Sequence, residues 1–160
     1  MTQTPTFPGA ERVRNQKATR VLVATYFTGL TAAVLLFIAL LATSLDTNVF
    51  VVCYTAAMLV SAVAWTIIRG ANDSKDRLPE AELDEYEREI FATWRNRAFR
   101  IFSALNPAGG FGFCVYAFFA GDTVDVTVLI AAGLYMIFTY LFVATLPMIG
   151  YAITFNRKED

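Results

Sequence analysis

Four long stretches without a single charged residue constrain this chain more than any other feature. They are residues 21–45, 48–68, 101–120 and 126–156. About 20 helical residues cross a bilayer core about 30 Å thick, and each stretch is at least that long. Because lipid offers no hydrogen-bond partners to the backbone, segments of this length can cross only as helices. The sequence therefore predicts an all-α integral membrane protein with four transmembrane helices.

The basic residues predict the orientation of these helices. All 13 Lys and Arg residues lie before the first stretch, between the second and third, or after the fourth. The other two connections, around Asp46 and around Asp122 and Asp125, contain none. Lys and Arg accumulate in cytoplasmic loops, so we expect both termini and the central linker in the cytoplasm, with the protein in the inner (cytoplasmic) cell membrane.

This orientation divides the chain into two transmembrane hairpins joined by a cytoplasmic linker. The segments are a cytoplasmic tail (1–20), hairpin 1 (21–69), a linker with a helix (70–98), hairpin 2 (99–156) and a second cytoplasmic tail (157–160). Asp46-Thr47 and Asp122-Thr123 occupy similar places in the two hairpins. The hairpins are either an internal repeat or independent, and the sequence leaves both open.

Small residues four positions apart form a stripe on each of the first three predicted spans. The stripes are Thr25, Gly29 and Ala33; Cys53, Ala57 and Ser61; and Ala104, Ala108 and Gly112. In lipid, helices associate where small side chains let their backbones approach. We expect these faces to meet inside one four-helix bundle, and association of two copies through one stripe is the alternative.

The third predicted span contains residues that disfavour a regular helix. They are Asn106, Pro107, Gly109, Gly110 and Gly112. Proline removes a helical hydrogen bond and disfavours helical angles in the preceding residue. The pattern predicts a kink or a short unwound segment. Such a break is either a hinge or binding site, as in transporters, or a kink that lets neighbouring helices approach.

The side chains needed for catalysis or metal binding are missing. The chain has no histidine, and its cysteines, Cys53 and Cys114, are too few and too far apart for a metal motif. No Asp, Glu, Lys or Arg lies inside a predicted span, whereas ion paths and proton relays usually use one. The sequence thus predicts a non-enzymatic protein with no cofactor, no metal and no catalytic residue.

The linker combines charge with a helical apolar pattern. Acidic residues follow Pro79, and Arg95, Arg97 and Arg100 precede the third span. This order suits the dipole of a helix over residues 79–98. Its apolar face is predicted to comprise Leu83, Tyr86, Ile90, Trp94 and Ala98. The first four of these are candidates for docking a partner, and a merely solvated charged surface is the alternative.

The segment LPEAELDEYEREI followed by RNRAFRIF resembles the linker of uncharacterised small bacterial membrane proteins, largely actinobacterial. Those proteins have a hairpin, an "LDE(R)" linker helix and a second hairpin. The resemblance covers about 30 residues plus the topology, and Tyr86 stands where that family commonly has Arg. The resemblance implies an architecture and brings no activity.

These observations favour an accessory or regulatory subunit of a cytoplasmic-membrane complex. Its partners would be the lipid bilayer and either another membrane protein or further copies of itself. A net charge of −1 gives no reason to expect nucleic acid. The alternative is a small oligomeric transporter or channel that uses the break in the third helix.

Overall fold

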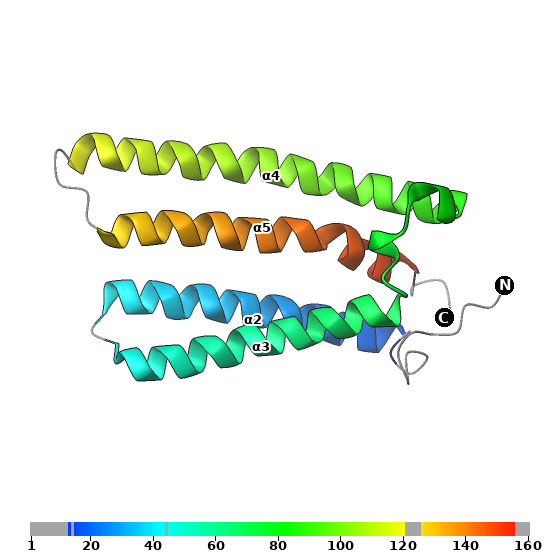
Figure 1. Ribbon diagram of the computed structural model, residues 1–160, viewed down its shortest axis with the longest axis horizontal. Helices are drawn as coiled ribbons and strands as arrows, with labels where there is room; N and C mark the ends of the chain where they lie inside the picture. The colour runs from blue at the N-terminus through cyan, green and yellow to red at the C-terminus, as the bar shows by residue number, and fades with distance from the viewer. Residues whose placement is uncertain (1–12, 14, 44, 121–125, 156–160) are drawn as a thin grey trace. The chain divides into compact units, whose positions relative to one another are not determined.

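The described residues are almost all helical and include no strand. The computed structural model describes residues 13, 15–43, 45–120 and 126–155. Its elements are α2 (Gln16–Ala42), α3 (Thr47–Ala71), the 3₁₀ turns η1 (Lys75–Arg77) and η2 (Glu80–Glu82), α4 (Glu85–Ala120) and α5 (Val126–Phe155) (Figure 1). All four α-helices are long and apolar enough to cross a membrane. The predicted all-helical fold with four such helices is confirmed, while Asp122, Thr123, Asp125 and most of both tails lie outside the described residues.

The chain divides into two compact units. Unit 1 comprises Met1–Phe91 and Met148–Asp160, and unit 2 comprises Ala92–Pro147. Unit 1 therefore contains α2, α3, the linker, the first turns of α4 and the last turns of α5. Unit 2 contains the remainder of α4 and α5.

Side-chain caps fix where the first two long helices begin. Asn15 Oδ1 accepts a hydrogen bond from the Ala18 N–H at 2.7 Å, so α2 begins at Gln16, five residues before the uncharged stretch. Asp46 Oδ1 accepts from the N–H groups of Asn48 and Val49 at 2.9 and 3.1 Å. Such caps satisfy N–H groups that have no partner within the helix. Polar residues at the edge of each stretch thus extend the helix beyond its apolar part.

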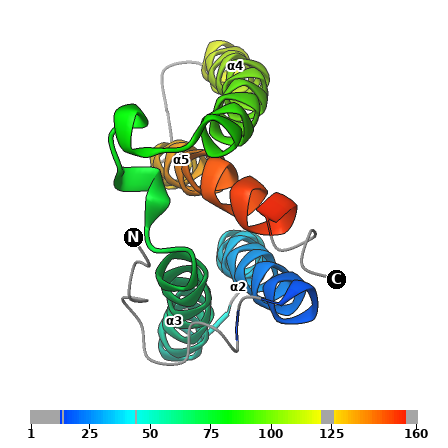
Figure 2. The same cartoon turned by 90° about the vertical axis from the view of Figure 1, so that its right-hand side faces the viewer.

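In unit 1, α2 and α3 lie side by side (Figure 2) and approach each other closely at Gly29. A Cβ atom at Gly29 would lie 2.8 Å from the backbone oxygen of Ala57, closer than real side chains come. Ser61 Oγ also donates a hydrogen bond to the Tyr26 carbonyl at 3.1 Å. The small-residue stripes predicted for the first two spans therefore meet at Gly29, Ala57 and Ser61, whereas Cys53 of the second stripe is exposed.

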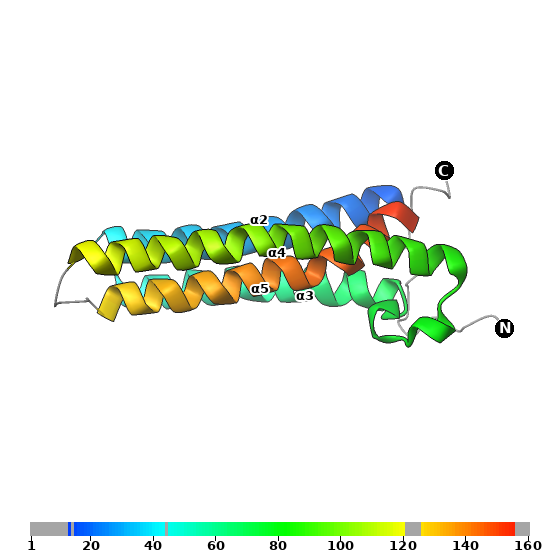
Figure 3. The same cartoon turned by 90° about the horizontal axis from the view of Figure 1, so that it is seen from above.

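In unit 2, α4 runs as one uninterrupted helix through Pro107, which Figure 3 shows as a continuous ribbon. The unwound segment predicted between Asn106 and Gly112 is not found, because one proline removes a single N–H donor and the flanking turns stay intact. A bend at Pro107 remains a prediction. The hydroxyl of Tyr135 on α5 donates a hydrogen bond to the Leu105 carbonyl within the same stretch of α4.

The third small-residue stripe does not pack as predicted. Ala104, Ala108 and Gly112 are all exposed. The close approach occurs instead at Gly109, where an added Cβ atom would overlap the ring of Tyr135. One residue along a helix is about 100° around its axis. The contact between α4 and α5 therefore uses a different face from the predicted one.

The α-helix in the linker begins later than predicted. Pro79 precedes the 3₁₀ turn η2 rather than the first turn of an α-helix, and α4 begins at Glu85. Leu83 has extended angles, and Asp84 caps the new helix through a 2.7 Å hydrogen bond from the Glu87 N–H to its carboxylate. The cap at Asp84, rather than the proline, thus sets the start of the helix.

Candidate functional site

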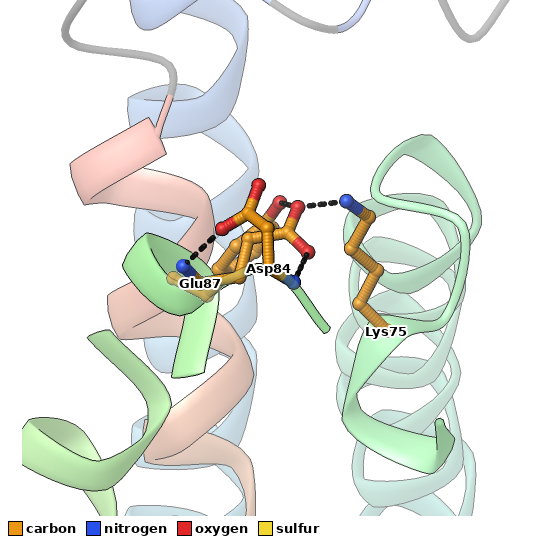
Figure 4. Close-up of polar contacts among 4 residues, drawn as sticks. Lys75, Asp84 and Glu87 are labelled. Carbon is orange, nitrogen blue, oxygen red and sulfur yellow. Dashed lines mark hydrogen bonds and ion pairs between the residues drawn. The ribbon is translucent and has the colours of Figure 1, made fainter. Parts of the chain in front are cut away.

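The most concentrated polar chemistry in the described residues surrounds Glu87, which is only 4% exposed. One carboxylate oxygen, Oε1, forms an ion pair with Lys75 Nζ and accepts a hydrogen bond from the Tyr151 hydroxyl at 3.0 Å. The other, Oε2, accepts from the Asp84 N–H at 3.4 Å. Figure 4 shows Lys75, Asp84 and Glu87 converging on this point. We call Lys75, Asp84, Glu87 and Tyr151 the Glu87 cluster, and all four belong to unit 1.

Asp84 and Glu87 form a reciprocal capping box at the start of α4. Each backbone N–H donates to the carboxylate of the other residue, at 2.7 Å to Asp84 and 3.4 Å to Glu87. This arrangement satisfies N–H groups that the first helical turn leaves unpaired. An acidic residue followed three positions later by Glu is a recognisable signal, although this box was not among the features predicted from the sequence.

The turn at the end of α3 brings Lys75 to the cluster. Ser74 N–H donates to the Arg69 carbonyl at 2.9 Å and Asp73 N–H to the Gly70 carbonyl at 3.3 Å. This is a Schellman motif, which usually has Gly in the left-handed position. Here Asp73 occupies that position with φ 56°, and Asp tolerates it better than most residues.

A second ion pair fixes the same turn. Arg69 Nε donates to Asp76 Oδ1 at 3.0 Å, and its terminal nitrogen Nη2 lies 2.6 Å from Oδ2. This two-pronged contact joins the last turn of α3 to η1. The ion pair therefore restrains Asp76 and, with it, the neighbouring Lys75.

Aromatic rings surround the cluster. The Tyr151 ring stacks on Phe91 with centroids 4.8 Å apart and on Phe155 with centroids 5.3 Å apart. Lys75 Nζ lies 5.9 Å from the centroids of both Tyr151 and Phe155, within range of cation–π attraction. Tyr151 is only 1% exposed, so its ring and hydroxyl are both used inside unit 1.

The geometry of the Glu87 cluster indicates a structural role. Its carboxylate already receives an ammonium, a hydroxyl and an N–H group, so a substrate would have to displace one of them. A buried ion pair of this kind costs about 3–5 kcal/mol of stability if one partner is removed. Among the described residues, no group of His, Cys, Asp and Glu could hold a metal ion.

The four residues predicted to dock a partner have different surroundings. Leu83 and Ile90 are buried, at 4% and 7% exposure, whereas Tyr86 is 37% exposed. Trp94 is half-buried, with the Arg97 guanidinium carbon 4.7 Å from its ring centroid. Leu83 and Ile90 are covered by the chain itself, so the predicted docking surface is reduced to Tyr86 and part of Trp94.

Two residues of the predicted break, Gly109 and Gly112, line an open groove between α4 and α5 in unit 2. Gly109 lies under the Tyr135 ring, while Gly110 and Gly112 have open space where a side chain would be. The groove has a volume of about 370 Å³. Its lining is Gly109, Gly112, Phe113, Tyr116, Thr127, Val128, Ala131 and Tyr135. No Asp, Glu, Lys or Arg lines it, so it offers no charged group to a substrate or ion.

No family model, curated protein or solved structure matches this chain. The class of protein therefore rests on the fold and the site described above. It is an all-helical chain with four helices long and apolar enough to cross a membrane, and its polar residues are organised in a connecting segment.

Proposed function

We propose that this chain is a multi-pass protein of the cytoplasmic membrane that acts as a non-enzymatic accessory or regulatory subunit of a larger complex. In this proposal, α2 with α3 and α4 with α5 form two transmembrane hairpins, joined by a folded cytoplasmic linker. The distribution of the 13 basic residues supports this orientation.

The observation that carries the proposal is the lack of burial along α4. None of the residues in its most apolar 18-residue window is buried, whereas 22% of the corresponding window of α2 is. The exposed part of α4 includes the small-residue stripe of Ala104, Ala108 and Gly112. Such stripes allow close packing of helices in lipid, so this face suits a transmembrane helix of a partner protein.

The alternative of an oligomeric transporter or channel depended on unwound backbone in the third span. Transporters coordinate substrates and ions with such backbone groups. Because α4 is helical from Asn106 to Gly112, the main support for that alternative is absent. The transporter or channel is one of the outcomes that the experiment below can detect.

Affinity purification in a mild detergent, followed by mass spectrometry, tests the subunit role. We expect a stoichiometric membrane protein to co-purify with the wild type and to be lost with Ala108→Leu, which places a bulky side chain on the stripe. Ala117→Leu is the matched control, since Ala117 is also exposed and lies about half a turn around α4 from Ala108.

The same purification can also contradict the proposal. Purification of the chain alone, or of a homo-oligomer that conducts ions in liposomes, would exclude the accessory-subunit role. Equal recovery of a partner with Ala108→Leu and Ala117→Leu would show that the α4 stripe is not its binding face.

A further inference from the structure

Three exposed arginines lie on α4 between its acidic start and its apolar span. Arg95, Arg97 and Arg100 are all exposed. No acidic residue follows Glu89 before the end of α4 at Ala120. We call these three residues the arginine band.

The helical period places Arg100 away from the less exposed side of α4 and Arg97 at the edge of that side. That side includes Ala98, which is 5% exposed, and the half-buried Ile101 and Leu105. Positions three or four apart share a helix face. Arg100 is offset from all three of these positions, whereas Arg97 is four residues from Ile101. Both side chains are exposed, so their guanidinium groups can reach an external ligand.

Aromatic side chains flank the band in an order that matches a membrane surface. The Arg97 guanidinium carbon lies 4.7 Å from the centroid of the half-buried Trp94 ring, a cation–π contact that restrains it. On the side of the apolar span, Phe102 is 38% exposed, and Phe99, which lies within the band, is 69% exposed. Water would disfavour two such phenyl rings, whereas the acyl chains of a bilayer would accept them.

The length of the band agrees with this placement. Arg95 and Arg100 are separated by about 7.5 Å along the helix axis, from the rise of 1.5 Å per residue. The polar layer on each side of a bilayer core is roughly 5–7.5 Å thick, so the band matches its upper limit. A helix that crosses the membrane with Phe102 in the acyl region would hold all three guanidinium groups at headgroup depth.

We propose that the arginine band binds the phosphate of an anionic phospholipid headgroup in the cytoplasmic leaflet. Guanidinium groups bind phosphate oxygens through two parallel N–H donors. An anionic phospholipid such as phosphatidylglycerol is preferred over phosphatidylcholine, whose choline carries a cation of its own. This inference rests on the membrane placement of the proposed function but not on the subunit role.

Thermal melting of the purified full chain in a mild detergent, with added lipid, tests this inference. We expect phosphatidylglycerol to raise the melting temperature and phosphatidylcholine to leave it unchanged. The triple variant Arg95→Gln, Arg97→Gln, Arg100→Gln should lose the shift. Each basic residue near an anionic surface is worth about a fivefold change in binding, so binding should weaken about a hundredfold.

A charge-matched control separates a defined site from general attraction. The triple variant Arg20→Gln, Arg77→Gln, Arg88→Gln removes the same charge from exposed arginines outside the band, and we expect it to keep most of the shift. Replacement of the band by three lysines should keep only part of it, because lysine has the charge without the two-pronged geometry. Native mass spectrometry of the wild type with both lipids provides a readout that does not depend on the variants folding, and selective retention of phosphatidylglycerol is expected there.

Several outcomes would overturn the inference. One is an equal melting shift in the glutamine variant of the band and the wild type. Another is an equal loss of the shift in the charge-matched control. A third is a comparable shift with soluble glycerol phosphate, which would indicate a site for free phosphate. The result does not depend on the partner experiment, since a chain without a protein partner can still select anionic lipid.

Discussion

The hydroxyl of Tyr151 donates a 3.0 Å hydrogen bond to the carboxylate of Glu87, although 64 residues separate the two in sequence. This bond joins the last turns of α5 to the first turns of α4 within unit 1. Lys75, from the turn after α3, completes the contact from a third element. The Glu87 cluster therefore fixes three helix ends relative to one another, and its loss should loosen these helix ends before the spans themselves.

Replacing Lys75 by Met should destabilise the protein strongly. Glu87 has a side chain only 6% exposed, and it would lose its cation while remaining buried. The cost should be about 3 kcal/mol, at the lower end for a broken buried pair because Lys75 is 20% exposed. Thermal unfolding in detergent measures this cost, and the double variant Lys75→Met, Glu87→Gln should recover part of the lost stability.

Asp76→Asn is the control for Lys75→Met, since it breaks the more exposed pair with Arg69 and should cost less than about 1 kcal/mol. A Lys75→Met variant that melts like the wild type would contradict a stabilising role for the cluster.

Gly29→Ala should weaken the packing of α2 against α3. The added methyl group would lie 2.8 Å from the Ala57 carbonyl oxygen, and this backbone atom cannot move without shifting α3. The expected cost is about 1–3 kcal/mol, typical of overpacking. Gly133→Ala is the control, because nothing lies within 4 Å of that position, and it should be neutral or slightly stabilising. The same melting temperature for both variants would disprove the close approach at Gly29.

Gly109→Ala should disturb the contact between α4 and α5, because its methyl group would overlap the Tyr135 ring. The ring would have to move and give up its hydrogen bond to the Leu105 carbonyl. Gly110→Ala, one residue along, meets open space and serves as the control. We expect lower thermal stability for Gly109→Ala only, by about 1–3 kcal/mol. Equal effects at the two glycines would mean that the Tyr135 ring does not pack on Gly109.

Leu83→Ser and Ile90→Ser should each destabilise the linker by about 1.5–3 kcal/mol, the cost of losing a buried aliphatic side chain. Both residues are buried, whereas Tyr86 is 37% exposed. Tyr86→Ser should therefore leave the melting temperature almost unchanged and, under the proposed function, reduce recovery of a partner that docks on the linker. Undiminished recovery with a folded Tyr86→Ser variant would remove the linker from the docking surface.

Reporter fusions should place three parts of the chain in the cytoplasm. The sites are residue 1, the exposed Ala81 in the linker and residue 160. A fluorescent reporter should be active at all three, and alkaline phosphatase, which requires the extracytoplasmic side, should be inactive. An active phosphatase at any of them would refute the four-span orientation.

The amino-acid sequence by itself determined the four long apolar helices and their approximate limits. Uncharged stretches of 20 or more residues have few alternatives, because a span must be apolar along its length and must satisfy its own backbone. The small-residue contact of Gly29 on α2 with Ala57 and Ser61 on α3 was also readable, since helical spacing places such residues on one face of each helix. The capping box at Asp84 and Glu87 lies within four residues and could have been found by the same local reasoning.

The tertiary structure alone decided the contacts between elements far apart in the chain. Nothing in the sequence pairs Glu87 with Lys75, 12 residues away, or with Tyr151, 64 residues away. The choice of Gly109 rather than Ala108 for the close contact depended on where the Tyr135 ring lies. Periodicity marks the apolar side of a helix, but the neighbouring elements decide which of its residues are covered, as for the buried Ile90 and the exposed Tyr86.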